Sequence, residues 1–249
     1  MSRHTKIVAT LGPASSDLLT LERLVQAGVD VVRLNFSHGK AEDHIARATQ
    51  IREAAQLVGR PVGILADMQG PKIRVGKFEE GKVTLIKDAA FILDAALAGP
   101  GNVHRVGLDY KDLPRDVKPG DVLLLDDGRL KLGVDRVLGQ EIHTRVKVGG
   151  ELSNNKGINR QGGGLTAPAL TAKDMEDIKT AALIGVDFVA ISFPKGAADM
   201  YMARQLLRAA GSSAMLIAKI ERTEAVANLE EILDASDGIM VARGDLAVE

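Results

Sequence analysis

The sequence contains no cysteine and no tryptophan, and only 3% of its 249 residues are aromatic. The lack of cysteine excludes a disulfide framework and a thiolate metal site. It also fits a reducing compartment, so we expect a cytoplasmic protein. The low aromatic content leaves little surface for stacking on nucleic-acid bases. These absences argue against a disulfide-rich secreted protein and against a nucleic-acid-binding protein.

A long hydrophobic run and an excess of one charge are also missing. No run of about 18 apolar residues occurs, so no segment is long enough to span a membrane. Met1–Lys6 leads directly into a short predicted strand, without the apolar region or the cleavage site of a signal peptide. The net charge of −1 gives no field for nucleic acid or anionic lipid. We therefore expect neither a membrane partner nor a nucleic-acid partner, and local charge has to provide recognition.

What the chain does contain is an internal repeat. Gln26–Val32 resembles Leu183–Val189, and Ser236–Val241 is a weaker third copy. In each copy we expect a helix to end at a glycine with a left-handed conformation, before an apolar run. These runs are too continuous for half-exposed strands, so both faces of the sheet should be covered, as in a parallel α/β protein.

The apolar runs alternate with segments of helical spacing along the first and last thirds of the chain. We predict strands at Lys6–Leu11, Val29–Asn35, Val62–Asp67, Val186–Ser192, Met215–Lys219 and Gly238–Val241, and helices at Leu18–Ala27, Ala41–Val58, Lys173–Ile184, Ala198–Ala210 and Thr223–Ala235. No glycine-rich dinucleotide turn follows the first strand, and polar residues close almost every strand. This pattern favours a TIM-type (β/α)8 barrel, with six of its eight strands in this chain, over an open doubly wound sheet.

Between Lys72 and Gly164 the pattern changes to alternating and β-branched segments. We predict strands at Lys82–Ile86, Phe91–Ala95, Val122–Leu125, Arg129–Val134 and Glu141–Val148, with turns at Asp126-Asp127-Gly128 and Gly149-Gly150. The predicted domains are therefore 1–72 (barrel, first part), 73–164 (inserted all-β domain) and 165–249 (barrel, second part). The insert leaves after the third barrel strand, so it can act as a lid over the strand ends, although it can also be a surface decoration.

Charged residues follow the last two predicted barrel strands. Glu221 and Asp245 are expected to end neighbouring parallel strands, which lie about 5 Å apart, so the two carboxylates can share one divalent metal. Lys219 would be a cation beside them. A solvated ion cluster is the commoner role of such charges, but burial at strand ends makes it costly.

Two further strand ends carry polar residues. Period two places Arg33, Asn35 and Ser37 on one face, a set that suits phosphate or a cation, although a single arginine is more often part of a salt bridge. His38 follows in the loop. Asp67 lies where a buried strand meets the cleft, and its charge is expected to be uncompensated.

The predicted insert contributes two more cations. Gly70-Pro71 takes the chain out of the sheet, which leaves Arg74 at the hinge of the insert. Lys156 lies in Leu152–Asn159, which looks like a turn, and taken alone it would be an ordinary surface lysine.

Together these residues resemble pyruvate kinase, and the resemblance covers the whole chain. Its motifs occur in the family's order: Thr10-Leu11-Gly12-Pro13-Ala14, Arg33-Leu34-Asn35-Phe36-Ser37-His38-Gly39, Gln69-Gly70-Pro71-Lys72-Ile73-Arg74, Lys156-Gly157-Ile158-Asn159, Lys219-Ile220-Glu221 and Val241-Ala242-Arg243-Gly244-Asp245-Leu246. The resemblance implies phosphoryl transfer between phosphoenolpyruvate and ADP, giving pyruvate and ATP, by a cytoplasmic homotetramer.

The resemblance also implies roles for individual residues. Glu221 and Asp245 would ligate Mg²⁺ or Mn²⁺, Arg33 and Lys219 would hold the transferring phosphoryl group, and the backbone N–H of Gly244 would bind the substrate carboxylate. Nucleotide contacts would come from Asn35, Phe36, Ser37, His38, Arg74 and Lys156, with Lys156 brought in by a closing lid along with a second Mg²⁺.

One departure from the family pattern concerns K⁺. The monovalent cation site of the family corresponds to Asn35, Ser37, Asp67 and Met68 of this sequence. Members that need K⁺ carry glutamate where this chain has Lys72. A lysine ammonium there would supply the positive charge internally, so we predict that K⁺ is not required.

The second departure is the end of the chain at Glu249, before the remaining two barrel strands and the family's C-terminal domain. We therefore expect a fragment of a longer enzyme. An inactive fragment that binds metal or other chains is one alternative function. A lyase or mutase that handles a metal-bound enolate on the same barrel is another, but it would need neither the insert nor Lys156.

Overall fold

The computed structural model describes residues 4–248, which fold into two compact units. Unit 1 contains the described residues up to Gly70 together with Ala169–Ile220 and Asn228–Val241. Unit 2 contains Pro71–Pro168, Glu221–Ala227 and the described residues from Ala242 onward. None of the helices within residues 4–248 combines the length and the hydrophobicity needed to cross a bilayer.

Unit 1 is built on a six-stranded parallel sheet whose strands lie in chain order. The strands are β1 (Val8–Thr10), β2 (Val31–Asn35), β3 (Gly63–Asp67), β12 (Phe188–Ile191), β13 (Met215–Ile220) and β14 (Gly238–Val241), and every neighbouring pair is parallel. The predicted alternation of helices with a parallel sheet is confirmed. Each predicted strand is present. Three of them begin two residues later than predicted, and a fourth, β3, begins one residue later.

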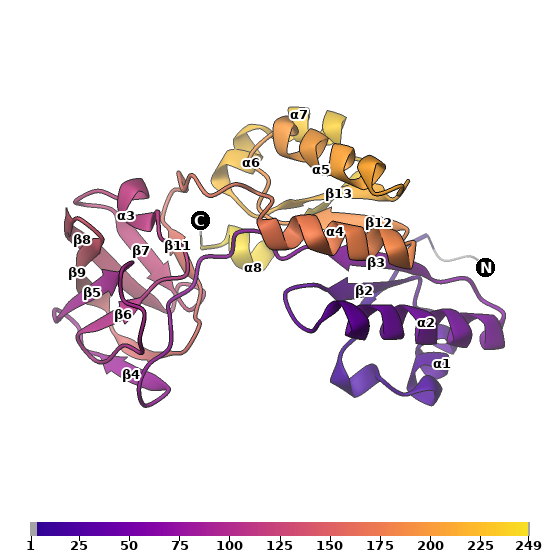
Figure 1. Ribbon diagram of the computed structural model, residues 1–249, viewed down its shortest axis with the longest axis horizontal. Helices are drawn as coiled ribbons and strands as arrows, with labels where there is room; N and C mark the ends of the chain where they lie inside the picture. The colour runs from indigo at the N-terminus through magenta and orange to yellow at the C-terminus, as the bar shows by residue number, and fades with distance from the viewer. Residues whose placement is uncertain (1–3, 249) are drawn as a thin grey trace. The chain divides into compact units, whose positions relative to one another are not determined.

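Five helices accompany this sheet: α1 (Leu18–Gln26), α2 (Ala41–Val58), α4 (Ala172–Ile184), α5 (Ala197–Ala209) and α7 (Leu229–Ala235) (Figure 1). Gly185 ends α4 in the left-handed conformation, with φ of 67°, as the repeat predicts. Gly28 also has a positive φ, of 100°. The third copy is different, because Gly238 is the first residue of β14 and not a helix cap.

The single helix predicted over Thr223–Ala235 is wrong. The segment forms α6 (Thr223–Ala227) and α7, which are separated at Asn228. The side-chain amide of Asn228 donates a hydrogen bond to the backbone carbonyl of Lys195, 2.8 Å away. We attribute the break to this contact with a distant segment, which apolar spacing along the helix does not reveal.

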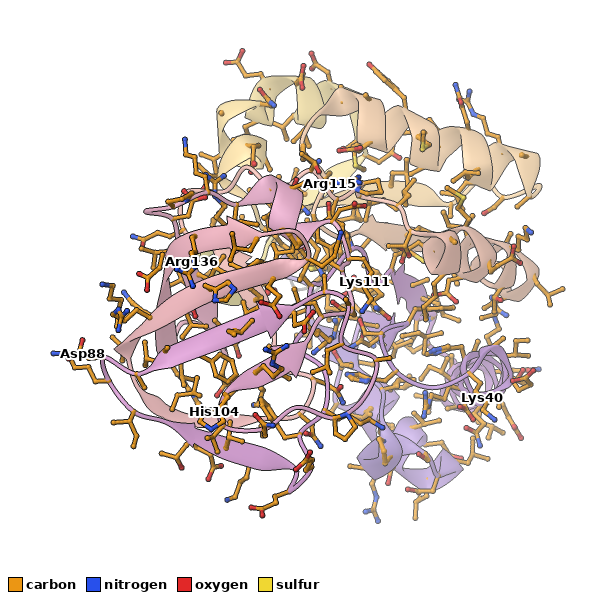
Figure 2. The ribbon with its side chains drawn as sticks, turned by 60° about the vertical axis from the view of Figure 1, so that its left-hand side comes forward. Lys40, Asp88, His104, Lys111, Arg115 and Arg136 are labelled. Atoms are coloured by element: carbon orange, nitrogen blue, oxygen red, sulfur yellow. The ribbon has the colours of Figure 1, made fainter. Side chains whose placement is uncertain are left out.

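Unit 2 contains a six-stranded sheet in the order β11-β7-β8-β9-β5-β6 and a two-stranded sheet of β10 and β4. The bounds are β4 (Lys82–Leu85), β5 (Ala90–Asp94), β6 (Arg105–Gly107), β7 (Val122–Leu125), β8 (Leu130–Leu138), β9 (Glu141–Val148), β10 (Gly150–Ser153) and β11 (Ile158–Arg160). All pairs except β5 and β6 are antiparallel. The inward faces form one apolar core, and exposed side chains such as Asp88, His104 and Arg136 point away from it (Figure 2).

Three strands of unit 2 were not predicted. β6, β10 and β11 have three or four residues each, too few for a clear alternation. Leu152–Asn159, which we expected to be a turn, therefore contains the end of β10 and the start of β11. Gly149-Gly150 is also not a hairpin turn, since Gly150 begins β10. The Asp126-Asp127-Gly128 turn is confirmed, with φ of 50°, 54° and 80°. The short helices α3 (Leu113–Asp116), α6 and α8 (Arg243–Leu246) also belong to this unit.

Candidate active site

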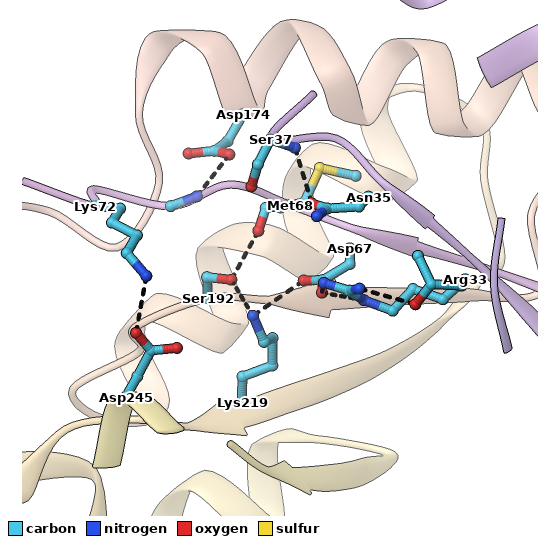
Figure 3. Close-up of polar contacts among 12 residues, drawn as sticks. Arg33, Asn35, Ser37, Asp67, Met68, Lys72, Asp174, Ser192, Lys219 and Asp245 are labelled. Atoms are coloured by element: carbon cyan, nitrogen blue, oxygen red, sulfur yellow. Dashed lines mark hydrogen bonds and ion pairs between the residues drawn. The ribbon is translucent and has the colours of Figure 1, made fainter. Parts of the chain in front are cut away.

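A buried carboxylate lies at the carboxyl ends of the strands of unit 1. Asp67 ends β3 and is 1% exposed. Its Oδ2 accepts a hydrogen bond from Nε of Arg33 at 2.6 Å, and its Oδ1 lies 3.2 Å from Nζ of Lys219 (Figure 3). The prediction that Asp67 is uncompensated is therefore wrong, because cations from two other strands hold both of its oxygens. Burial of an isolated carboxylate would be very costly, and the two cations remove that cost.

The same cluster continues through Ser192, the residue after β12. Nζ of Lys219 donates to Oγ of Ser192 at 2.7 Å, and this hydroxyl donates to the backbone carbonyl of Met68 at 2.7 Å. Arg33 also donates to the hydroxyl of Thr10 at 3.0 Å. The carboxyl ends of β1, β2, β3 and β13 and the residue that follows β12 thus meet at one polar cluster inside unit 1.

The loop after β2 carries four of the predicted nucleotide contacts. Asn35 pairs with Asp67 in the strand register, and its Oδ1 accepts a hydrogen bond from the backbone N–H of Ser37 at 3.1 Å. His38 is exposed in the loop. Asn35, and Ser37 through its hydrogen bond to Asn35, thus lie beside the cluster around Asp67.

Phe36 faces the interior instead. It is 1% exposed, and its ring stacks on that of His44 with 4.0 Å between centroids. Burial lowers the pKa of His44, and the nearby Arg47 lowers it further, so both favour the neutral imidazole. The backbone carbonyl of Phe36 accepts a hydrogen bond from Nζ of Lys173 at 2.7 Å. The Phe36 side chain therefore holds the loop in place and is not available to a ligand.

Unit 2 holds the other predicted site residues. Nζ of Lys72 lies 3.0 Å from Oδ1 of Asp245, and the two side chains are 28% and 25% exposed (Figure 3). Arg74 forms a β-bridge with Gly157, and its guanidinium donates to the backbone carbonyl of Asn155 at 2.9 Å. The segments around Arg74 and Lys156 therefore run side by side within this unit.

Lys156 has a carboxylate partner of its own. Its Nζ lies 2.7 Å from Oδ1 of Asp126, a 7% exposed residue with a φ of 50°. A positive φ is uncommon for a residue other than glycine, so the turn fixes where this carboxylate lies. Both lysines of unit 2 that we predicted to act in the site are thus paired with aspartates.

The predicted metal ligands differ in their surroundings. β13 and β14 are adjacent and parallel, and Glu221 directly follows β13, as expected; its side chain is buried. Asp245 does not end a strand, because β14 ends at Val241 and Asp245 lies in α8. A side chain at Gly244 would meet no atom within 4 Å, so the chain itself gives no steric reason for glycine there.

These two carboxylates suit a hard cation, because Mg²⁺ is commonly bound by one or two protein carboxylates and completes its shell with water and substrate oxygens. Within residues 4–248 no group of three or more acidic, histidine or cysteine side chains could hold a metal ion. A metal held by Glu221 and Asp245 would take its remaining ligands from water or a substrate.

Three partners in these contacts were not predicted as site residues, namely Ser192, Asp126 and Thr10. Ser192 had a sequence signal, since it is the polar residue at the end of the predicted strand Val186–Ser192. Asp126 was assigned only to a turn. Which cation each residue would contact depends on how distant segments pack together and could not be inferred from the sequence.

Comparison with known proteins gives a consistent result. The family model described as pyruvate kinase, barrel domain, matches residues 2–249. "Pyruvate kinase II" of Salmonella typhimurium is 57% identical over 251 residues, which cover 99% of this chain and 52% of the relative. "Pyruvate kinase" of Haemophilus influenzae is 56% identical over the same coverage, and that of Corynebacterium efficiens is 47% identical over 100% of this chain and 52% of the relative. The chain spans about half the length of the curated relatives it matches.

Proposed function

This chain belongs to the pyruvate kinase family, and from that premise we propose that it serves the transfer of a phosphoryl group from phosphoenolpyruvate to ADP, the last step of glycolysis. The observation that carries the proposal is the pair of cations at the carboxyl ends of the parallel strands, Arg33 and Lys219, which share the buried carboxylate of Asp67. Two cations held at a strand-end cluster suit an anion whose charge changes during reaction.

Arg33 and Lys219 would act on the transferring group. In a loose transition state, negative charge spreads over the oxygens of the phosphoryl group, so fixed cations stabilise this state more than the ground state. Asp67 would hold both cations in position before the substrate binds, so that little reorganisation is needed during the reaction. Preorganised charge of this kind commonly contributes several kcal/mol to catalysis.

Glu221 and Asp245 would hold Mg²⁺ or Mn²⁺, with the backbone N–H of Gly244 directed to the substrate carboxylate. The metal would neutralise the substrate's oxygens when bound. Asp245 would first have to leave Lys72, whose ammonium lies 3.0 Å from it.

The nucleotide would contact Asn35, Ser37 and His38 in unit 1 and Arg74 and Lys156 in unit 2, with Phe36 contributing only to the shape of its loop. Arg74 also lines a cavity of about 540 Å³ in unit 2, whose charged lining consists of the cations Arg74, Lys77 and Lys111 and the acidic residues Glu79 and Asp109. We also propose that unit 2 acts as a lid that excludes water, on the six strands of a larger (β/α)8 barrel, in a cytoplasmic homotetramer.

A separate part of the proposal concerns K⁺. Asn35, Ser37, Asp67 and Met68 would be the monovalent cation site, but Asp67 already contacts Arg33 and Lys219, and the carbonyl of Met68 accepts the hydroxyl of Ser192. These contacts and the ammonium of Lys72 support an enzyme that works without K⁺. Activity in Na⁺ should then equal that in K⁺, and Lys72→Glu should create a K⁺ requirement. Strong activation of the unmutated protein by K⁺ would refute this part.

The function is tested by measuring pyruvate formation from phosphoenolpyruvate with and without ADP, for this chain and for a longer chain that completes the length of its relatives. We expect ADP-dependent turnover that requires Mg²⁺. Consumption of phosphoenolpyruvate without ADP and without release of pyruvate would favour the lyase or mutase, whereas release of pyruvate without ADP would indicate transfer of the phosphoryl group to water. No turnover by the longer chain would refute the proposal, whereas turnover by the longer chain alone would identify this chain as an inactive portion.

The metal assignment has its own test. Glu221→Ala and Asp245→Ala should each weaken Mn²⁺ binding at least about tenfold, or 1.4 kcal/mol, because each removes one of two anionic ligands. Asp199→Ala changes an acidic residue in the first turn of α5 and is the matched control, for which we expect no change. Unchanged affinity in both single variants would remove the metal assignment.

A further inference from the structure

We propose that Ser192 is a positioning residue for Lys219, an inference that rests on the proposed phosphoryl transfer. The ammonium of Lys219 contacts the carboxylate of Asp67 at 3.2 Å and the hydroxyl of Ser192 at 2.7 Å. A lysine side chain has four rotatable bonds, and one ion pair restricts only its distance from the partner. The second contact, from a different strand end, determines where the ammonium lies.

The direction of the hydrogen bond at Ser192 supports this role. The hydroxyl proton is directed to the backbone carbonyl of Met68, 2.7 Å away, so the oxygen presents a lone pair to the ammonium of Lys219. Ser192 is 2% exposed, so water cannot readily take its place. The hydroxyl thus couples the lysine of β13 to the backbone at the end of β3.

The backbone around Ser192 is itself held by close packing. Gly70 has a φ of 65°, and a Cβ atom there would lie 2.8 Å from Cβ of Ser192. The N–H of Gly70 donates to Oδ1 of Asp174, a fully buried residue, at 3.0 Å. Because Ser192 packs against this anchored loop, it gives Lys219 a rigid contact.

The inference has a test that does not need catalysis. In the 249-residue chain, the rate at which a small acylating reagent modifies each lysine is measured by mass spectrometry. Ser192→Ala should raise the rate at Lys219 several-fold relative to the other lysines, because the ammonium loses one of its contacts and becomes more accessible. Ser192→Cys keeps the volume but accepts hydrogen bonds weakly, and it should give a smaller rise. Ser236→Ala is the matched control, since its hydroxyl donates to the carbonyl of Ile232 at 2.6 Å and contacts no lysine in this cluster; we expect no change.

Kinetics then test the catalytic consequence in the form of the protein that turns over phosphoenolpyruvate. Ser192→Ala should lower kcat about tenfold with less than about a twofold change in KM, because displacing the ammonium removes more transition-state stabilisation than ground-state stabilisation. An unchanged labelling rate at Lys219 in folded Ser192→Ala would overturn the inference, as would faster labelling with an unchanged kcat. If the unmutated protein does not turn over phosphoenolpyruvate, the proposed function fails, but the labelling result still decides whether Ser192 holds Lys219.

Discussion

Replacing Lys72 with methionine should tighten the binding of Mn²⁺. Nζ of Lys72 lies 3.0 Å from Oδ1 of Asp245, and the two side chains are 28% and 25% exposed. Ion pairs with this degree of solvent contact contribute about 0.2–1 kcal/mol. A metal that takes Asp245 must displace the ammonium and forfeit this energy. Methionine removes the charge and retains an unbranched apolar side chain, so the affinity should rise by up to about fivefold.

The assay is a titration of free Mn²⁺ by electron paramagnetic resonance, at low and at high ionic strength. The difference in Mn²⁺ affinity between Lys72→Met and the unmutated chain should shrink at high salt, since salt screens a partly exposed ion pair. Lys82→Met is the control, because Nζ of Lys82 lies 2.7 Å from Oε2 of Glu151, a carboxylate with no proposed role. An equal or weaker affinity in Lys72→Met would show that the ammonium does not compete with the metal.

Three further outcomes are expected. Lys219→Met should lower kcat of an active, longer form by several orders of magnitude with little change in KM for phosphoenolpyruvate. If the affinity for phosphoenolpyruvate falls as much as kcat does, Lys219 is a ground-state ligand. Gly70→Ala should lower the free energy of unfolding in urea by about 1–3 kcal/mol. The control is Gly211→Ala, because Gly211 has a φ of 77° but open space around it, and this variant should lose less stability. An equal loss of stability in the two variants would exclude the clash with Ser192. Because burial lowers the pKa of His44 below its ordinary 6.5, the unfolded chain binds more protons, so the free energy of unfolding should fall between about pH 7.5 and pH 5.5. His44→Leu should flatten this pH dependence. An unchanged slope of the free energy of unfolding against pH in this variant would show that His44 is not its cause.

The parallel sheet of unit 1 could be predicted because each strand carries its own signal. The continuous apolar runs and the glycine at position 185 are local properties of the sequence, and they identified every strand of this sheet. The short strands of unit 2 could not be predicted in this way. Ile158–Arg160 has only three residues, and it is a strand because it pairs with β7, from Ile158 opposite Leu125 to Arg160 opposite Leu123. The family assignment was also available from the sequence, since the ordered motifs predicted it and the family model confirms it.

The site residues could be predicted more reliably than their partners. Polar residues at the ends of apolar runs indicated Arg33, Asp67 and Lys219, because parallel strands bring such ends together. The contacts among them depend on which strands are neighbours. Ser192 and Met68 are 124 positions apart, and Lys72 and Asp245 are 173 apart, so no local pattern joins either pair. Asp67 was taken as uncompensated for this reason.

The order of the strands in unit 1 has a consequence for how the chain folds as it is synthesised. β1, β2 and β3 can pair in turn while the ribosome is still working, because each is joined to the next by one helix. β12 can pair with β3 only after the intervening segment has been synthesised, since Ser192 and its partner Met68 are 124 positions apart. The bridge between Arg74 and Gly157 brings the ends of most of that segment together. If unit 2 folds first, the loop to be closed falls from about 120 to about 40 residues, which lowers the entropic cost of closure by about 1 kcal/mol. We therefore expect the inserted unit to assist, and not to delay, the completion of the sheet around it.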